Sequence, residues 1–245
     1  MEKHFLYDDS TASNSLTGEA ANDKKAGKLS SPFKAPFAVV EAYKNIRIRL
    51  MSILEKYPEK KIIAISSPNA AAGKSTTSVN LAITLSQIGK KVMLIDGDIR
   101  RATVDKKLRI ENGLGCSDVL AGNCQFNEAV VNYNPNMDIL TSGSVVSNPS
   151  DLLGSVEFDH LLNDLREIYD YIIIDTPPLN LVSDTLAISK KCDGVILVAR
   201  VGLSTYAELK SALESLKILD ICVLGAIVNG VEDVKKKYKS YYGYK

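Results

Sequence analysis

The chain has 245 residues, of which 45% are hydrophobic and 24% are charged, an ordinary composition for one large α/β domain or two small ones. Its formal net charge is +1, which excludes binding to nucleic acid through overall charge. The amino-terminal residues lack the apolar core of a signal peptide. The longest apolar run, at 221–228, is too short to cross a membrane. We therefore expect a cytoplasmic protein.

The cysteines show neither a CxxC pair nor the spacing of metal ligands. We therefore expect reduced, buried thiols in place of a disulfide or a metal site. The four residues concerned are Cys116, Cys124, Cys192 and Cys222.

Residues 1–58 divide into an arm and a helix. Residues 1–35 are polar and carry few large apolar side chains, so burial cannot offset the entropy of ordering them, and we expect a disordered arm. A helix is expected from about residue 36 to Pro58, because apolar residues recur there at spacings of three and four. Its apolar stripe consists of Val39, Tyr43, Ile46, Leu50, Ile53 and Leu54.

From residue 61 onward, short apolar runs alternate with helical patterns. Strands are expected at 61–66, 91–96, 137–140, 171–175, 194–199 and 222–228. Helices are expected at 75–88, which we read as amphipathic, 156–169, 184–191 and 204–219. This alternation predicts an α/β domain over 36–232, with a mostly parallel sheet covered by helices on both faces. Ligands of such sheets bind at the carboxyl ends of the strands.

The segment SSPNAAAGKSTT, residues 66–77, follows the first of these strands. Gly73, Lys74 and Ser75 form the GK[ST] core of a P-loop, in which backbone N–H groups and the lysine bind phosphates and the hydroxyl reaches Mg²⁺. The loop deviates from the consensus, because Pro68 replaces the first glycine and alanines occupy 70–72. An alanine forced to positive φ costs about 1–2 kcal/mol. A chance GKS triplet is disfavoured by its place between a strand and a helix.

Carboxylates end two more of the expected strands. Asp96 and Asp98 in DGDIRR could orient a metal-bound water or accept a proton, although a polar turn with a helix cap explains this stretch equally well. Asp175 in YIIIDTPP ends its strand as a Walker B carboxylate does when it supports Mg²⁺. Together with the P-loop, these strand ends predict a site for ATP and Mg²⁺. Asn229, after the last strand, is a candidate contact for the base.

The segments at 61–77, 92–101 and 171–178 resemble the Walker A, A′ and B motifs of the bacterial tyrosine kinases of capsule and exopolysaccharide synthesis, relatives of the Min and Par partition ATPases. The resemblance covers residues 36–245. It implies a P-loop NTPase fold in which Ala72, Gly73, Lys74, Ser75 and Thr76 contact the nucleotide. It further implies that Ser75, Asp98 and Asp175 support Mg²⁺, with Lys74, Asp96, Asp98 and Asp175 in catalysis. Partition ATPases usually carry a second lysine where this chain has Asn69, which favours the kinase branch.

The sequence ends in KKKYKSYYGYK, at 235–245. The resemblance implies that its tyrosines are autophosphorylated by a neighbouring subunit. The candidate acceptors are Tyr238, Tyr241, Tyr242 and Tyr244. We expect the segment 233–245 to be flexible, because it is cationic and has little hydrophobic content. A basic tail that touches anionic lipid is the competing interpretation.

The expected first helix also carries Glu41, Lys44 and Arg47 on one broad face. These residues resemble the E-x-x-R-x-x-R motif that joins kinase subunits in a ring, with lysine at a position where arginine is preferred; a solvated face with local ion pairs is the alternative. The family implies further partners: a separate membrane-embedded activator of polysaccharide assembly, protein-tyrosine substrates and a phosphatase. A partition-type ATPase switch, and a scaffold whose altered P-loop binds no nucleotide, remain the other hypotheses.

Overall fold

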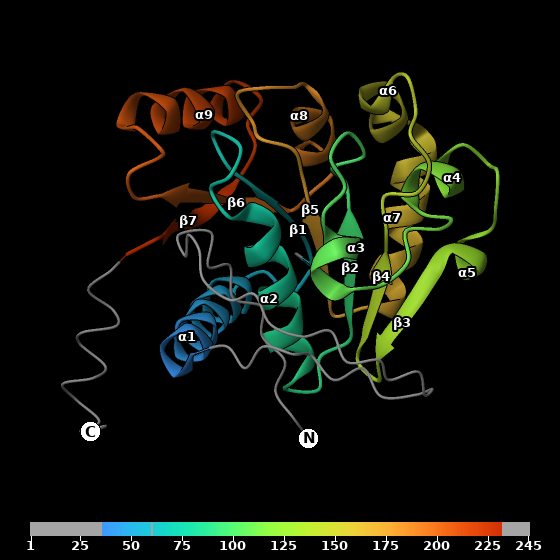
Figure 1. The fold of residues 1–245 in the computed structure, drawn as a ribbon, viewed down its shortest axis with the longest axis horizontal. Coiled ribbons are helices and arrows are strands. Elements are labelled where there is room, and N and C mark those ends of the chain that lie inside the picture. The colour runs from blue at the N-terminus through green and yellow to red at the C-terminus, as the bar shows by residue number, and fades with distance from the viewer. Residues whose placement is uncertain (1–35, 60, 232–245) are drawn as a thin grey trace, which may run out of the picture.

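The computed structural model describes residues 36–59 and 61–231, and these form one sheet with helices on both faces (Figure 1). The strands are β1 (Ile62–Ser66), β2 (Val92–Asp96), β3 (Val130–Asn134), β4 (Met137–Leu140), β5 (Tyr171–Asp175), β6 (Gly194–Arg200) and β7 (Val223–Asn229). Their order across the sheet is β3-β4-β2-β5-β1-β6-β7. The predicted α/β class is confirmed.

All neighbouring strands run parallel except β3, which pairs antiparallel with β4 at one edge of the sheet. Strands β1, β2 and β5 lie side by side at its centre. Ile65 pairs with Asp175 and Asp96 pairs with Asp175 in register, so three strand ends and the loops that follow them meet on one side. This register determines the position of the site.

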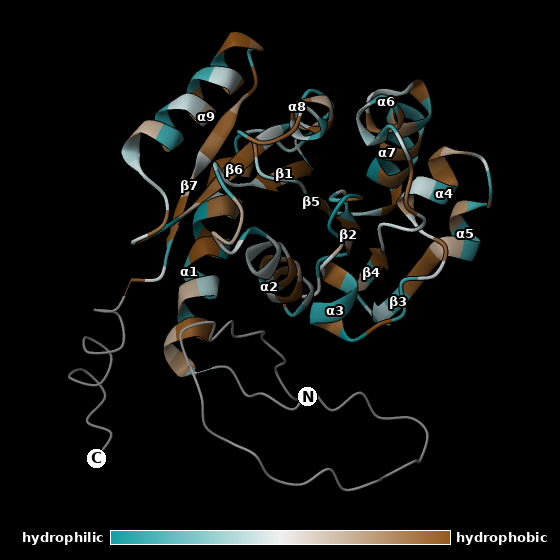
Figure 2. Cartoon of the chain, turned by 45° about the horizontal axis from the view of Figure 1, so that its top comes forward, coloured by the Kyte–Doolittle hydropathy of each residue, from teal (hydrophilic) through white to brown (hydrophobic). Residues whose placement is uncertain are grey.

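The helices form two groups, as Figures 1 and 2 show. On one face lie α1 (Phe37–Leu54), α2 (Lys74–Ser86) and α3 (Val104–Leu108), and on the other lie α4 (Cys116–Leu120), α5 (Phe126–Ala129), α6 (Pro149–Gly154), α7 (Val156–Ile168), α8 (Asp184–Ser189) and α9 (Tyr206–Ile218). The strands serve both faces by alternation. In β1, for example, Ile63 and Ile65 pack toward α2, whereas Ile62 packs toward α7.

Helix α2 departs from the expectation of an amphipathic helix, because it is buried along its whole length. It packs against α1, α3 and strands β1, β2 and β5. Polar residues therefore lie inside the protein, where they need partners. Thr84, for example, accepts a hydrogen bond from Arg47 of α1 on its hydroxyl at 3.2 Å. The amphipathic reading was wrong because the polar side of the helix faces protein instead of water.

The segment between β2 and β4, which the sequence showed only as polar, contains α3, α4, α5 and the edge strand β3. The expectation for the cysteines was partly wrong. All four thiols are free, but only Cys116 is buried, and Cys222 is exposed beside the outer strand β7. The described helices include none that is long and apolar enough to cross a membrane.

Candidate active site at the carboxyl ends of the central strands

The loop from Ser67 to Gly73 connects β1 to α2 in a backbone conformation that alanine adopts only with strain. Ala71 has φ 62° and Gly73 has φ 97°, both in the left-handed region. A Cβ atom on Gly73 would lie 2.3 Å from Asn229 Nδ2. Asn229 itself donates that amide to the carbonyl of Ala72 at 3.2 Å. The expected alanine strain therefore falls on Ala71, and the end of β7 holds the loop.

Lys74, the first residue of α2, joins the loop to the carboxylates. Its Nζ lies 2.8 Å from Asp98 Oδ2 and 3.8 Å from Asp175 Oδ2. The other oxygen of Asp175 accepts a hydrogen bond from Ser78 Oγ at 3.0 Å. All these side chains are buried or nearly so. The structure thus brings together three of the predicted catalytic residues in one buried cluster.

Asp96 lies in the same cluster, but its carboxylate is hydrogen-bonded to backbone N–H groups. Its carboxylate accepts hydrogen bonds from the N–H groups of Asp98 at 3.2 Å and of Thr103 and Val104 at 3.1 Å. It is fully buried. These hydrogen bonds fix the 97–104 turn that presents Asp98. From the sequence, a polar turn and a carboxylate site were equally good explanations of this stretch, and the structure shows both.

Burial and mutual repulsion perturb the ionisation of these groups. Burial and the charge of Asp175 raise the pKa of Asp96 to about 7, although N–H groups of Val104 and Thr103 oppose the change. Burial likewise raises the pKa of Asp175 against the attraction of Lys74. For Lys74, burial disfavours the charged form, but Asp175 and Asp98 outweigh it and raise the pKa. Lys74 therefore stays protonated and positively charged in the folded protein.

The buried oxygens without a hydrogen-bond partner in the described part of the chain include Asp175 Oδ2 and Thr76 Oγ1 in this region. Buried polar atoms are normally paired, so these atoms are open to a ligand. Carboxylate and hydroxyl oxygens suit Mg²⁺ and the loop suits phosphate. The residues present therefore fit a nucleotide with its magnesium ion.

Arg100 belongs to the DGDIRR segment, but the sequence predicted neither a role for it nor its partner. Arg100 Nε and Nη2 donate to the buried Asp184 of α8 at 2.6 and 3.1 Å, a bidentate pair that joins the DGDIRR turn to the opposite face. The sequence feature that could have indicated this pair is Asp184 itself, which lies at the start of the helix predicted at 184–191. Asn69 donates to Glu208 of α9 at 2.5 Å, and this contact anchors the start of the loop.

The proposed interface residues lie on α1, away from this cluster. Lys44 forms an ion pair with Glu41 within the helix, and Arg47 donates to the carbonyl of Thr84 in α2 at 2.9 Å. Their role between subunits stays a prediction. The four tail tyrosines and the arm at 1–35 lie outside the described residues.

Comparison with known proteins identifies the relatives of this fold. A family model described as an AAA domain matches residues 60–219. Tyrosine-protein kinase CpsD of Streptococcus agalactiae is 36% identical over 188 residues, which cover 76% of this chain and 82% of the relative. The chain belongs to the bacterial tyrosine-protein kinase family. The solved kinase domain of Escherichia coli tyrosine kinase ETK superposes with a TM-score of 0.74 at 33% identity, covering 78% of this chain and 75% of that domain.

A more distant neighbour shares the fold of this chain. The septum site-determining protein MinD from Pyrococcus horikoshii OT3, solved with Mg-ADP, has a TM-score of 0.58 at 26% identity and covers 69% of this chain and 70% of its own. The predicted P-loop NTPase fold is confirmed. Because the closely similar relatives are tyrosine kinases, the kinase interpretation is confirmed over a switch without kinase activity.

Proposed function

We propose that this kinase uses ATP and Mg²⁺ to phosphorylate the tyrosines at 238, 241, 242 and 244 of a neighbouring copy. The observation that carries the proposal is the contact between Lys74 and Asp98 at 2.8 Å beside the phosphate loop. It joins a phosphate-binding cation to a carboxylate that can accept a proton, and phosphoryl transfer to a phenol requires both.

Each residue of the cluster has a role in this reaction. Ser75, Asp98 and Asp175 would hold Mg²⁺, whose charge would offset that of the phosphates. Lys74 would turn from Asp98 to the β/γ oxygens of ATP. The oxygen of Asp98 that Lys74 has left would then accept a hydrogen bond from the tyrosine hydroxyl and take its proton, in addition to the support that Asp98 gives to Mg²⁺. Asp96 keeps that carboxylate in place through the N–H of Asp98.

Backbone groups and neighbouring side chains would hold the nucleotide. The N–H groups of Ala72, Gly73 and Ser75 border the loop at the start of α2 and suit phosphate. Thr76 has a buried hydroxyl without a partner in the described residues, so it is open to the same ligand. Asn229 reaches the loop from β7 and is the proposed contact to the base.

The wider context is the control of capsular or exopolysaccharide synthesis and export. Glu41, Lys44 and Arg47 would join copies of the chain into an oligomer, such as a ring, that presents each tail to the next active site. The cytoplasmic tail of a membrane-embedded activator would recruit the kinase to the inner face of the cell membrane. Other protein tyrosines are further substrates, and a phosphatase reverses the modification.

The decisive experiment incubates the purified chain with labelled ATP and Mg²⁺ and maps tryptic peptides from 235–245 by mass spectrometry. We expect phosphotyrosine in wild type and none in Lys74→Met or in a variant with all four tail tyrosines changed to phenylalanine. Released phosphate without phosphotyrosine would instead indicate an ATPase switch. Neither product would indicate a scaffold that has lost nucleotide binding. A mixture of active Tyr→Phe chains and inactive Lys74→Met chains tests transfer between copies, because only the latter carry acceptors.

A further inference from the structure

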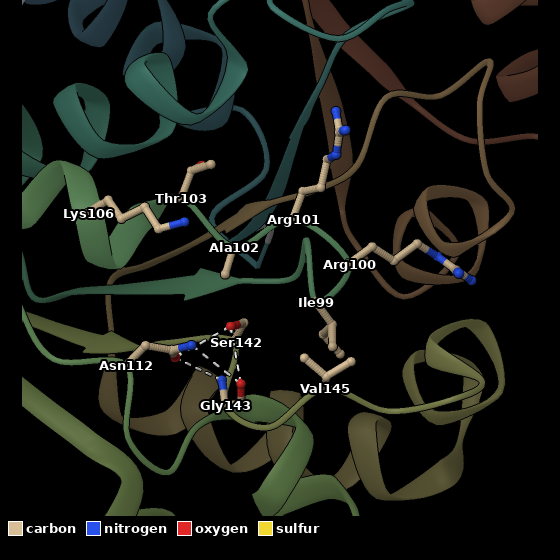
Figure 3. A pocket seen from close by; sticks show the side chains of 10 residues that line it. All are labelled: Ile99, Arg100, Arg101, Ala102, Thr103, Lys106, Asn112, Ser142, Gly143 and Val145. Atoms are coloured by element: carbon tan, nitrogen blue, oxygen red, sulfur yellow. Dashed lines mark hydrogen bonds between the residues drawn. The ribbon is translucent and has the colours of Figure 1, made fainter.

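A cavity of about 430 Å³ begins at Ile99, the residue after Asp98, and contains no residue of the phosphate loop. It is lined by Ile99, Arg100, Arg101, Ala102, Thr103, Lys106, Asn112, Ser142, Gly143 and Val145 (Figure 3). Its size is typical of a site for a small ligand or a single side chain. The mechanism above uses none of these side chains.

The cavity is cationic. Figure 3 shows Lys106 with its ammonium turned into the space, whereas Arg100 points away, toward its partner Asp184. Arg101 and Lys106 are both exposed, and within the described residues neither forms a salt bridge. Arg101 is also tied to the catalytic carboxylate, because its backbone N–H donates to Asp98 Oδ1 at 3.1 Å. Two positive charges without a salt bridge in the described residues thus border a cavity that begins next to the proposed proton acceptor.

The opposite wall is held in a fixed shape. Asn112 Oδ1 accepts the N–H of Gly143 at 3.1 Å, as Figure 3 shows. Asp118, behind this wall, accepts the N–H groups of Gly115 and Ser144, both at 3.0 Å. Gly143 has φ 78°, and a Cβ there would lie 2.4 Å from Asp118 Oδ2. The cavity is therefore a built feature of the 112–118 and 142–145 segments.

The cavity combines apolar and anion-binding surfaces. Ile99 is buried, Ala102 is half-buried, and Val145 is 90% exposed at the rim. Together with the ammonium of Lys106 and the exposed side chain of Arg101 at the rim, which in Figure 3 points away from Ser142 and Gly143, they match an aromatic ring that carries a dianionic phosphate. An unmodified tail with its five lysines would meet two like charges here and be repelled.

We propose that this cavity binds a phosphotyrosine side chain from the tail of a second copy of this chain. The first phosphorylation event would then anchor the tail, so that the next tyrosine in KKKYKSYYGYK is presented to Asp98. Each phosphotyrosine brings about −1.5 to −2 charges, which reverses the repulsion between the tail and the cavity. The proposal rests on the tail being an acceptor of this kinase, as stated above.

The test measures binding of fluorescent peptides with the sequence of residues 233–245, phosphorylated at Tyr242 or unmodified, to the full chain. Saturating Mg-ADP fills the nucleotide site and prevents transfer, so the measurement does not depend on kinase activity. We expect the phosphopeptide to bind at least about tenfold more tightly than the unmodified peptide, as for charge-assisted hydrogen bonds. Phenyl phosphate should displace it at lower concentration than inorganic phosphate, because only phenyl phosphate also contacts Ile99 and Val145.

Variants distinguish binding at this cavity from nonspecific attraction between the phosphopeptide and positive charge elsewhere on the protein. Lys106→Ala and Arg101→Ala should each weaken phosphopeptide binding about tenfold. Lys106→Arg keeps the positive charge and should bind the phosphopeptide almost as tightly as the wild type. The matched control Lys217→Ala removes one exposed lysine from α9, which contributes no residue to the cavity lining, and should change nothing. Equal affinity for the two peptides, or equal loss in Lys106→Ala and Lys217→Ala, would overturn the proposal. Tight phosphopeptide binding without phosphotyrosine in the kinase assay would refute only the proposed tail acceptor.

Discussion

Single residues of the phosphate loop store conformational strain. Ala71 adopts φ 62°, a conformation that costs an L-residue about 1–2 kcal/mol and costs glycine nothing. Ala71→Gly should therefore raise the free energy of unfolding by about 0.5–1 kcal/mol, after the greater freedom of glycine in the unfolded chain is subtracted. Urea denaturation measures the change. Ala70→Gly is the control: Ala70 is not among the described residues with positive φ, so that variant should be destabilised.

Asp96 makes stability depend on pH near neutrality. Its pKa of about 7 in the folded protein exceeds the usual value of an unfolded aspartate, so between about pH 4 and pH 7 the folded state binds more protons. The stability of the nucleotide-free protein should then fall by roughly 2 kcal/mol between pH 5 and pH 7.5. Denaturation midpoints across this range provide the measurement. The same slope in Asp96→Asn would show that another group is responsible.

Among the secondary-structure elements, α1 shares an apolar core with α2 through Leu50 and Leu54, and Arg47 adds hydrogen bonds between the two helices. Arg47 donates two hydrogen bonds to Thr84, whereas Lys44 forms an ion pair with Glu41 of its own helix. Arg47→Ala should lower the unfolding free energy by about 1–2 kcal/mol, and Lys44→Ala by less than about 0.5 kcal/mol. If the proposed ring interface is right, both variants also assemble less well in light scattering. Assembly unchanged in Lys44→Ala would argue against the interface.

Sequence patterns predicted those elements whose own residues determine them. Strands β1, β2 and β5 are continuous apolar runs because they are buried on both faces, and this pattern is visible without tertiary context. Strand β3 was missed because it is a half-exposed edge strand that pairs antiparallel with β4. Helix α3 was missed because it is short and its first turn is held by a distant carboxylate, Asp96.

The same distinction applies to the site. Lys74, Asp98 and Asp175 could be predicted because each belongs to, or directly follows, a strand-end motif, and parallel strands bring such motifs together. Asp184 could not, because its pairing with Arg100 depends on how α8 packs beneath the turn. The cavity beside Asp98 also depends on distant segments, around 112 and 143, that carry no motif.

At the scale of the whole molecule, phosphorylation of the tail should control assembly. Four phosphotyrosines would add roughly −6 to −8 charges and outweigh the five lysines of the tail. We predict that a first phosphotyrosine keeps the tail at the cavity, whereas a tail with all four is repelled from the carboxylate-rich active site, so that the fully phosphorylated protein forms smaller assemblies than the variant with four tail phenylalanines. Multi-angle light scattering of the two samples decides this. Identical masses would refute the switch.

The ion pair between Lys74 and Asp98 has a consequence for the sequence of events in each turnover. Without nucleotide the lysine neutralises the carboxylate, so a phenol that arrives early finds no base. The triphosphate must come first, because it draws the ammonium away. Steady-state kinetics should therefore follow a compulsory order, with ADP competitive against ATP and a tyrosine-free tail peptide uncompetitive against ATP. In the nucleotide-free enzyme, the ion pair thus prevents Asp98 from acting on a tyrosine too early.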